Sequence, residues 1–180
     1  MPGKAPPAEG KGLVMVFTGP GKGKTTAALG AALRAVGSGL RVLMIQFIKG
    51  GRRYGELDGA ALVDGLEIRP MGLGLIGGRK DLAPHRRAAR QAWQAARREL
   101  ASGRWEMLIL DEVFLALGRG FLERAELEEL LGSRPPGVHL VLTGRGCPPE
   151  LYGLADTVTE MAAVKHHLQA GCKAQAGIEF

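Results

Sequence analysis

Short apolar runs alternate with longer amphipathic stretches along the chain, and this pattern predicts parallel strands joined by crossover helices. The apolar runs that we interpret as strands cover residues 13–17, 41–47, 107–110 and 138–142. The amphipathic stretches that we interpret as helices cover residues 24–36, 84–101 and 123–131. The sequence therefore predicts an α/β fold with a mostly parallel sheet and helices on both of its faces.

Two other segments show less regular patterns of apolar and polar residues. Residues 49–79 are rich in glycine, so we expect a long loop region with at most one short strand, at residues 66–69. Residues 157–161 could form a further strand. We find no internal repeat and no domain boundary. We therefore expect a single domain over residues 12–180, preceded by a flexible arm at residues 1–11 that is rich in Pro, Gly and Ala.

Composition narrows the class of protein. The chain has 180 residues, of which 46% are hydrophobic and 23% are charged, as in ordinary globular proteins. No apolar run reaches the roughly 20 residues that a membrane span needs, and the first residues lack the apolar segment of a secretory signal. We expect a cytoplasmic protein. Cys147 and Cys172 form no C-x-x-C motif, so we expect reduced thiols and no structural zinc.

The net charge of +6 raises the question of nucleic-acid binding. Several arginines alternate with alanines, as on a solvated helix, and aromatic residues that could stack on bases make up 5% of the chain. A solvated face or a small polyanionic ligand is the favoured interpretation, and nucleic acid is the less favoured one. The arginines concerned are Arg86, Arg87, Arg90, Arg97 and Arg98.

Residues 18–26 read TGPGKGKTT and connect the first predicted strand to the first predicted helix. Glycines let the backbone turn its N–H groups towards one point, and the helix N-terminus adds positive potential there, so that phosphate is attracted. Lys24 would reach phosphate oxygens, and Thr25 or Thr26 would offer a hydroxyl to a magnesium ion. The segment therefore resembles a P-loop and predicts nucleotide binding.

The match to the P-loop pattern is imperfect. G-x-x-x-x-G-K-[ST] requires a glycine five residues before Gly23, where this chain has Thr18, and Gly19 stands one position later. The order of strand, loop, Gly-Lys-Thr and helix outweighs this difference. We therefore expect a P-loop NTPase-like (RecA-like) fold, and a glycine-rich turn that merely caps a helix is the less favoured alternative.

A second element with the chemistry of nucleotide sites is Leu-Ile-Leu-Asp-Glu at residues 108–112. It places Asp111 and Glu112 at the end of an apolar strand, where open α/β sheets bind their ligands. The segment resembles a Walker B strand, in which one carboxylate holds magnesium and the other contacts the ion or orients a water molecule. The alternative is that the two carboxylates lie at a solvent-exposed strand end and have no role in binding.

Further segments follow the Gly-Lys-Thr motif in a characteristic order. They are QFIKG at residues 46–50, VLTGRG with PPEL at residues 141–151, AD with VTEM at residues 155–161, VKH at residues 164–166, and AG, KAQ and GIEF within residues 170–180. Together with the P-loop they resemble the ATP:corrinoid adenosyltransferase family of cobalamin synthesis and salvage. The resemblance runs from about Gly12 to the C-terminus.

The resemblance implies an enzyme that transfers the 5′-deoxyadenosyl group of ATP to the cobalt of a reduced corrinoid and releases triphosphate. Its implied substrates are ATP and a cob(I)alamin- or cob(I)inamide-type corrinoid, with Mg²⁺ or Mn²⁺ as cofactor. Its implied partners are a second copy of the chain in a homodimer and a reducing flavoprotein. No membrane partner is expected.

The resemblance also implies site residues. Lys22, Lys24 and Glu112 are the expected catalytic residues, and Thr25, Asp111 and Glu112 the expected metal contacts. Arg145 stands between two glycines after a predicted strand, where a ligand-facing loop is expected; a contact to phosphate or to a corrinoid side chain and a solvated turn are the two interpretations of it. The triphosphate would be bound by Gly19, Pro20, Gly21, Lys22, Gly23, Lys24, Thr25 and Thr26. Cob(I)alamin is itself a strong nucleophile, so no side-chain base is required, and the protein's tasks are positioning and charge stabilisation.

Several positions depart from the family pattern. Pro20 replaces the usual Asn or Asp and removes a backbone donor from the phosphate loop. Val113-Phe114 follows the two carboxylates where members have Leu and then Asn or Thr, and His167 replaces a proline. Residues 74–77, Gly-Leu-Ile-Gly, stand where members carry an aromatic Gly-Phe-Thr-Trp segment, so Leu75, Ile76 or another group would have to contact the corrinoid.

Two alternatives to the transferase remain open from sequence. One is a P-loop ATPase on the same scaffold in which Glu112 orients a water molecule and orthophosphate is the product. The other is a nucleotide-dependent binding module that contacts RNA through the arginines of residues 86–98.

Overall fold

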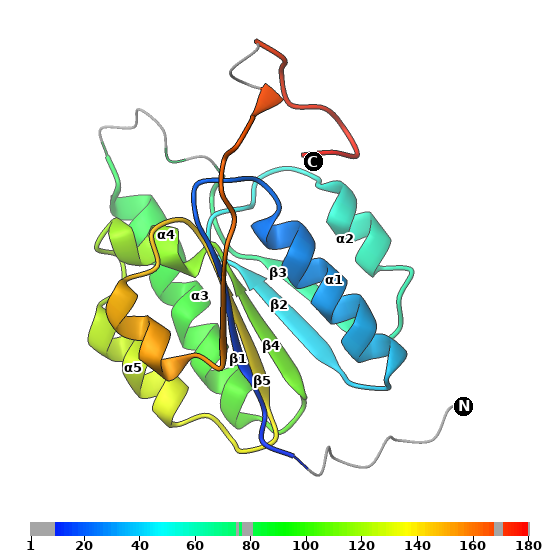
Figure 1. The fold of residues 1–180 in the computed structure, drawn as a ribbon, viewed down its shortest axis with the longest axis vertical. Helices are drawn as coiled ribbons and strands as arrows, with labels where there is room; N and C mark the ends of the chain where they lie inside the picture. Colours follow the sequence, from blue (N-terminus) through cyan, green and yellow to red (C-terminus); the bar gives the residue numbers. More distant parts are fainter. Residues whose placement is uncertain (1–9, 75, 77–80, 168–170, 180) are drawn as a thin grey trace.

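Six parallel strands form one sheet in the order β3-β2-β4-β5-β1-β6 (Figure 1). This computed structural model describes residues 10–74, 76, 81–167 and 171–179. The predicted α/β fold is confirmed, and every strand pairing in these residues is parallel. The strands are β1 (Val14–Thr18), β2 (Val42–Gln46), β3 (Leu66–Pro70), β4 (Met107–Asp111), β5 (His139–Thr143) and β6 (Thr157–Glu160).

Helices cover both faces of the sheet, as predicted. Helices α1 (Lys24–Gly37) and α2 (Gly55–Ala60) lie on one face (Figure 1). The other face carries α3 (Ala83–Ala101), α4 (Val113–Gly118) and α5 (Arg124–Gly132), followed along the chain by the 3₁₀ helix η1 (Pro149–Leu154). This arrangement is typical of P-loop NTPase-like proteins.

The central strands are apolar along their whole length because both of their faces are buried. In β2, Leu43 and Ile45 belong to the core beneath α3 and α4, whereas Val42 and Met44 belong to the core beneath α1. Strands β4 and β5 alternate in the same way. The two-residue period of a strand thus divides the hydrophobic residues between two cores.

The structure differs from the sequence-based prediction in three short helices. The loop predicted at residues 49–79 contains α2 as well as β3, so the prediction of a long irregular segment was wrong in part. Helix α4 and the 3₁₀ helix η1 were also not predicted. Each of these helices has six residues, which is too short for a 3.6-residue hydrophobic period to be recognised.

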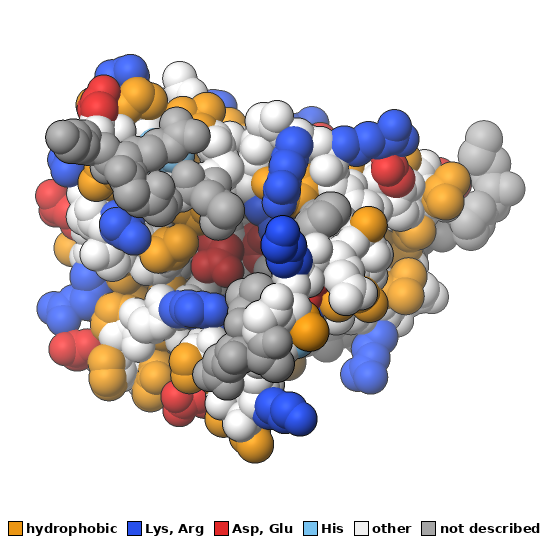
Figure 2. Space-filling model, turned by 90° about the horizontal axis from the view of Figure 1, so that it is seen from above, with side chains coloured by type: hydrophobic (Ala, Val, Ile, Leu, Met, Phe, Trp, Pro, Cys, Tyr) orange, Lys and Arg blue, Asp and Glu red, His pale blue; other side chains and the backbone are white. Residues whose placement is uncertain are grey.

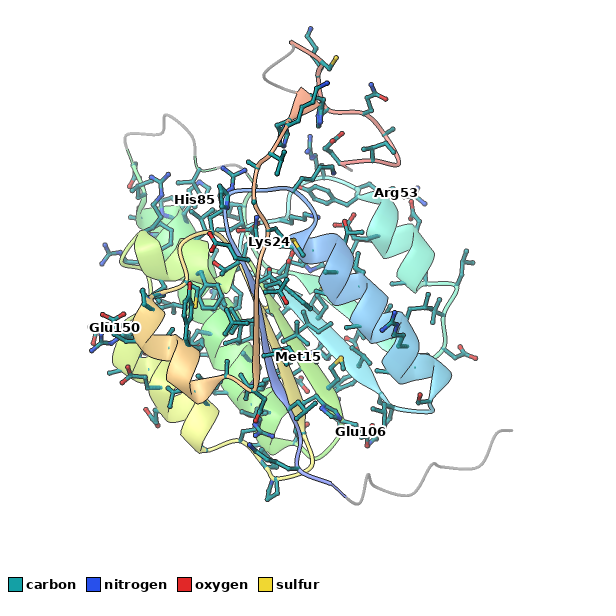
Figure 3. All side chains as sticks on the ribbon, viewed as in Figure 1. Met15, Lys24, Arg53, His85, Glu106 and Glu150 are labelled. Carbon is teal, nitrogen blue, oxygen red and sulfur yellow. The ribbon has the colours of Figure 1, made fainter. Side chains whose placement is uncertain are left out.

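Parallel strands bring all their carboxyl ends to one edge of the sheet. Figure 3 shows Lys24 at this edge, where α1 begins, and Glu106 at the opposite edge, before β4. The loops that follow β1, β2, β4 and β5 therefore meet at one end of the molecule, and they contain the predicted site residues.

Other expectations from the sequence concern the two cysteines, the N-terminal arm and residues 74–77. Cys147 and Cys172 are free thiols, as expected, and burial raises the pKa of Cys147 to about 11. Most of the arm expected at residues 1–11 lies outside the described residues, as do Leu75 and Gly77. Ile76 is described, and it is buried in the core beneath α3. Within the described ranges, no helix has the length and hydrophobicity needed to cross a bilayer.

Two arginines of the alanine-rich helix α3 form ion pairs with α5. Arg90 lies 2.6 Å from Glu126, and Arg97 lies 2.8 Å from Glu129. These arginines therefore contact an acidic neighbouring helix of the same chain.

A buried carboxylate joins α3 to the edge strand β3. Glu99 accepts hydrogen bonds from Arg69 at 2.6 Å and from the Trp105 indole at 2.8 Å, and Arg104 also contacts it. Burial acts to raise the pKa of Glu99, but these donors together lower it to about 2. The ionised form of Glu99 is therefore stabilised by folding.

We predict that this carboxylate contributes on the order of 3 kcal/mol to stability at neutral pH, since each unit of pKa shift corresponds to about 1.4 kcal/mol. Because its folded-state pKa is depressed, the contribution is present above the unfolded pKa of about 4.5 and is lost as pH falls towards 2. Glu99→Gln should lower the free energy of unfolding at pH 7 and flatten its dependence on pH between about 5 and 2. Urea unfolding at several pH values measures both effects.

The matched control for this prediction is Glu129→Gln, which removes an ion pair from an exposed carboxylate. It should change the free energy of unfolding by less than about 1 kcal/mol. Equal effects of the two substitutions would contradict the role assigned to Glu99.

Candidate nucleotide-binding site

The loop between β1 and α1 is shaped by glycines that no other residue could replace without strain. Gly19 and Gly23 adopt φ values of 96° and 110°. A Cβ atom at Gly19 or Gly21 would lie 2.6 Å from the carbonyl oxygen of Met161. The Gly21 N–H donates to that same oxygen at 2.6 Å. The loop therefore packs directly against the backbone that follows β6.

Lys24 is held inside this loop. Its side chain is buried, and Nζ donates to the carbonyl oxygens of Gly19 at 2.9 Å and Gly21 at 2.6 Å. Burial lowers the pKa of Lys24, and the charge of Arg145 lowers it further, against the opposing influence of Glu112. The structure thus fixes a cation at the first residue of α1, where the N–H groups of a helix attract anions.

Asp111 connects four elements at the floor of the site. Its Oδ1 accepts hydrogen bonds from the hydroxyls of Thr25 at 2.9 Å and Thr143 at 2.8 Å. Its Oδ2 accepts one from the amide of Gln46 at 3.2 Å. Asp111 is completely buried, so these donors replace the water that an ionised carboxylate would otherwise bind. Helix α1 is thereby joined to β2, β4 and β5.

Glu112 follows Asp111 in a left-handed backbone conformation, with φ of 59°. In the described chain it is the one non-glycine residue with positive φ, an arrangement that is seldom adopted outside functional sites and tight turns. Its N–H donates to the Thr143 hydroxyl at 2.9 Å. Burial and the charge of Asp111 raise the pKa of Glu112, while Lys24 opposes the shift.

These groups surround a cavity of about 560 Å³. Figure 2 looks onto this end of the molecule, where acidic side chains lie in a hollow with Lys and Arg side chains around it. The predicted site residues that line the cavity are Gly21, Lys22, Gly23, Lys24, Thr25, Thr26, Glu112 and Arg145. Three others do not line it: Gly19 contacts Lys24, Asp111 is buried behind Thr25, and Pro20 is exposed.

The second lysine of the loop contacts the C-terminal segment. Lys22 Nζ donates to the carbonyl oxygen of Ile178 at 2.8 Å and lies 3.4 Å from the Glu179 carboxylate. His167 lies 3.1 Å from the same carboxylate. Residues 177–179 line the cavity together with the phosphate loop. Segments at opposite ends of the chain therefore form the same site.

Several polar residues of the site were not predicted from the sequence. Gln46 and Lys49 belong to a segment that carried the family resemblance, but they were given no role. Glu56 lines the cavity from α2, a helix that was not predicted. Thr143 also belongs to a segment that carried the resemblance, but it was given no role, because a threonine at the end of an apolar strand is ordinary β-sheet sequence.

Comparison with known proteins agrees with this geometry. A sequence model of the ATP:corrinoid adenosyltransferase BtuR/CobO/CobP family matches residues 10–180. The chain belongs to this family. Its activity is therefore the transfer of an adenosyl group from ATP to a corrinoid, and the predicted function and enzyme class are confirmed.

Curated relatives match over most of their length. A corrinoid adenosyltransferase of Escherichia coli (strain K12) is 41% identical over 172 residues, which cover 94% of this chain and 86% of the relative. Corrinoid adenosyltransferase CobA of Salmonella typhimurium is 40% identical, with 96% and 87% covered. A corrinoid adenosyltransferase of Pseudomonas aeruginosa is 39% identical, with 94% and 84% covered.

We predict that Lys24→Ala lowers the rate of adenosyl transfer by at least about a hundredfold, because the buried cation of the phosphate loop is lost. Transfer rates and the Kd for ATP measure the effect, and circular dichroism checks that the variant is folded. Lys11→Ala is the control, because Lys11 is exposed and pairs with Asp156 outside the cavity. A folded Lys24→Ala protein with normal turnover would refute the assignment.

Proposed function

We propose that the cavity binds ATP with its triphosphate on residues 19–26, and that the enzyme transfers the 5′-deoxyadenosyl group to the cobalt of a reduced corrinoid and releases triphosphate. The observation that supports this most directly is the convergence of Lys24, Thr25 and Glu112 on one cavity. The cations Lys22, Lys49 and Arg145 also line it. A triphosphate requires such a concentration of positive charge.

The protein's tasks in this reaction are to position the two substrates and to stabilise the charge of the leaving group. Cobalt(I) donates an electron pair to the 5′ carbon of the ribose, the bond from this carbon to the α-phosphate oxygen breaks, and the bonding pair leaves with the triphosphate. Since cobalt is the nucleophile, no side chain has to remove a proton. Lys24, Lys22 and Arg145 would stabilise the charge of the departing triphosphate.

We also propose that Mg²⁺ or Mn²⁺ binds with the nucleotide at Thr25 and Glu112, while Asp111, which does not line the cavity, orients the Thr25 hydroxyl from behind. The hydroxyl of Thr25 already contacts Asp111, and hydroxyl and carboxylate oxygens suit these hard cations. Among the described residues, no group of three or more His, Cys, Asp or Glu side chains could hold a metal ion. Phosphate oxygens and water would therefore complete the shell, as magnesium prefers. When bound, the ion would offset phosphate charge.

Thr25→Val tests the metal assignment, because valine keeps the shape of threonine but removes the hydroxyl. We expect the Mg²⁺ concentration that gives half-maximal ATP binding to rise by about tenfold, with Lys24 undisturbed. Calorimetric titration of ATP at several Mg²⁺ concentrations measures this. Thr26→Val is the control, since Thr26 lines the cavity but its hydroxyl does not contact Asp111. Identical behaviour of the two variants would contradict the proposal.

The reaction itself is tested by anaerobic incubation of the protein with magnesium-ATP and chemically reduced cob(I)alamin. We expect adenosylcobalamin, detected by its absorbance, in equal amount to triphosphate. Orthophosphate without alkylation of the corrinoid would instead indicate an ATPase. The chemical reductant makes the assay independent of the natural electron donor.

We propose further that the enzyme is a cytoplasmic homodimer that receives its reduced corrinoid with the help of a reducing flavoprotein. An apolar groove of about 600 Å³, lined by Met15, Phe17 and Leu40 among others, lies beside α1. Leu33 on the same helix is exposed. Apolar surface of this kind favours association with another chain. Light scattering of the purified protein measures the mass of the assembly.

A further inference from the structure

The end of β5 lies beside the turn that follows β4. The two strands are parallel, and Leu110 pairs with Leu142, so the next residues along them, Asp111 and Thr143, meet at the same edge of the sheet. Thr143 is completely buried there. Its position beside the two carboxylates is therefore set by the register of the central strands, which are the most firmly packed part of the fold.

The Thr143 hydroxyl makes two hydrogen bonds of opposite direction. Its Oγ1 accepts the N–H of Glu112 at 2.9 Å and donates to Asp111 Oδ1 at 2.8 Å. Because a backbone N–H can only donate, the proton of the hydroxyl remains for the carboxylate of Asp111. One oxygen atom thus joins the side chain of the first acidic residue to the backbone of the second.

The backbone of Glu112 adopts a conformation that its own side chain disfavours. Its φ of 59° is left-handed, and in this region the Cβ atom of an ordinary residue comes too close to the following carbonyl oxygen. The hydrogen bond to Thr143 fixes the peptide group between Asp111 and Glu112. The chain therefore leaves β4 in a direction that puts Glu112 on the cavity wall, while Asp111 contacts Thr25 from behind.

The residue after Thr143 restrains the other side of the same turn. Gly144 has a φ of 140°, and a Cβ atom on it would lie 2.9 Å from Phe114 Cβ and 3.0 Å from Phe114 N. Helix α4 begins at Val113, so this backbone packs against the first turn of the helix that Glu112 precedes. The end of β5 thus contacts the chain at Glu112 and directly after it.

Loss of the Thr143 hydroxyl would affect the two carboxylates unequally. Asp111 would keep its hydrogen bonds from Thr25 and Gln46. The N–H of Glu112 would lose its acceptor, and an unpaired N–H at a buried position is costly. The turn would then relax towards a conformation with less strain, and the carboxylate of Glu112 would move from its place in the cavity.

We propose that Thr143 is a positioning residue for adenosyl transfer, whose hydroxyl holds Glu112 in the left-handed turn that presents its carboxylate to the cavity. Thr143 does not line the cavity, so it acts through Glu112 and not on a substrate. The proposal rests on the proposed role of Glu112 beside the nucleotide. A threonine suits this task because its branched side chain has few rotamers, so the hydroxyl is held in one direction.

The experiment compares wild type, Thr143→Val, Glu112→Gln and the double variant with magnesium-ATP and chemically reduced cob(I)alamin. Each single substitution should lower kcat by at least about tenfold, since a displaced group is nearly as harmful as a missing one. The double variant should match Glu112→Gln within about twofold, because both changes remove the same contact. In calorimetric titrations, both single substitutions should raise the Mg²⁺ concentration that gives half-maximal ATP binding.

Two further variants separate positioning from stability. Thr143→Ser keeps the hydroxyl, so its kcat should stay within about threefold of wild type despite the freer rotamer. Leu142→Val removes one methylene group from the buried core on the same strand. It should lower the melting temperature and leave kcat unchanged.

A purely structural role for Thr143 predicts that the two losses multiply, so that the double variant is at least about fivefold slower than Glu112→Gln. That result would overturn the proposal, as would normal turnover of folded Thr143→Val or a Thr143→Ser protein as slow as Thr143→Val. Normal turnover of Glu112→Gln would overturn it as well, because Thr143 would then position no functional group. Transfer by the wild type in the same assay would show that the activity itself stands.

Thr143→Cys provides a second variant should Thr143→Val fail to fold. A buried thiol packs like a small hydrophobic group and is a weak hydrogen-bond partner. Its kcat should fall in the same direction, again with little further loss when Glu112→Gln is added. Normal turnover of a folded Thr143→Cys protein would contradict the proposal.

Discussion

The buried carboxylate of Asp111 is the interaction on which the site depends. An ionised group without solvent is costly to bury unless donors surround it, and here the hydroxyls of Thr25 and Thr143 and the amide of Gln46 do so. Each of these donors belongs to a different element, so Asp111 can be satisfied only when α1, β2 and β5 are in place beside β4. The start of α1 is thereby fixed relative to the sheet edge.

Chain segments that are distant in sequence complete this framework. The phosphate loop packs against the backbone after β6, where Gly19 and Gly21 leave no space for a side chain. All four side chains of β6 are exposed, so its position comes from backbone pairing with β1 rather than from hydrophobic burial. Lys22 then contacts residues near the C-terminus. The result is a cavity lined by both the loop before α1 and residues 177–179, which suits a reaction whose requirements are alignment and control of charge.

Helix α2 has only six residues, but it forms one wall of the cavity. A long glycine-rich loop with at most one short strand was the prediction for residues 49–79, because the six residues of α2 are too few for a hydrophobic period to be recognised. In the folded chain this segment contributes an edge strand and a six-residue helix that brings Glu56 to the cavity. Lys49 and Gln46 hold Glu56 ionised, which a linear pattern of residue types does not reveal.

The sequence by itself determined the α/β fold, the family and the glycine-rich loop before α1, since these follow from local signals: continuous apolar strands, amphipathic helices, and glycines beside Gly-Lys-Thr. It also identified Asp111 and Glu112 as a pair, because two carboxylates at a strand end are visible without a structure. Only the tertiary structure separated their roles, with Asp111 buried as a hydrogen-bond acceptor and Glu112 on the cavity wall in a left-handed turn. It alone placed Gln46, Thr143 and Glu56 at the site. These residues make contacts between neighbouring strands or between a strand and a helix. Which side chains meet in such contacts depends on strand register and on packing, and no local sequence pattern encodes either.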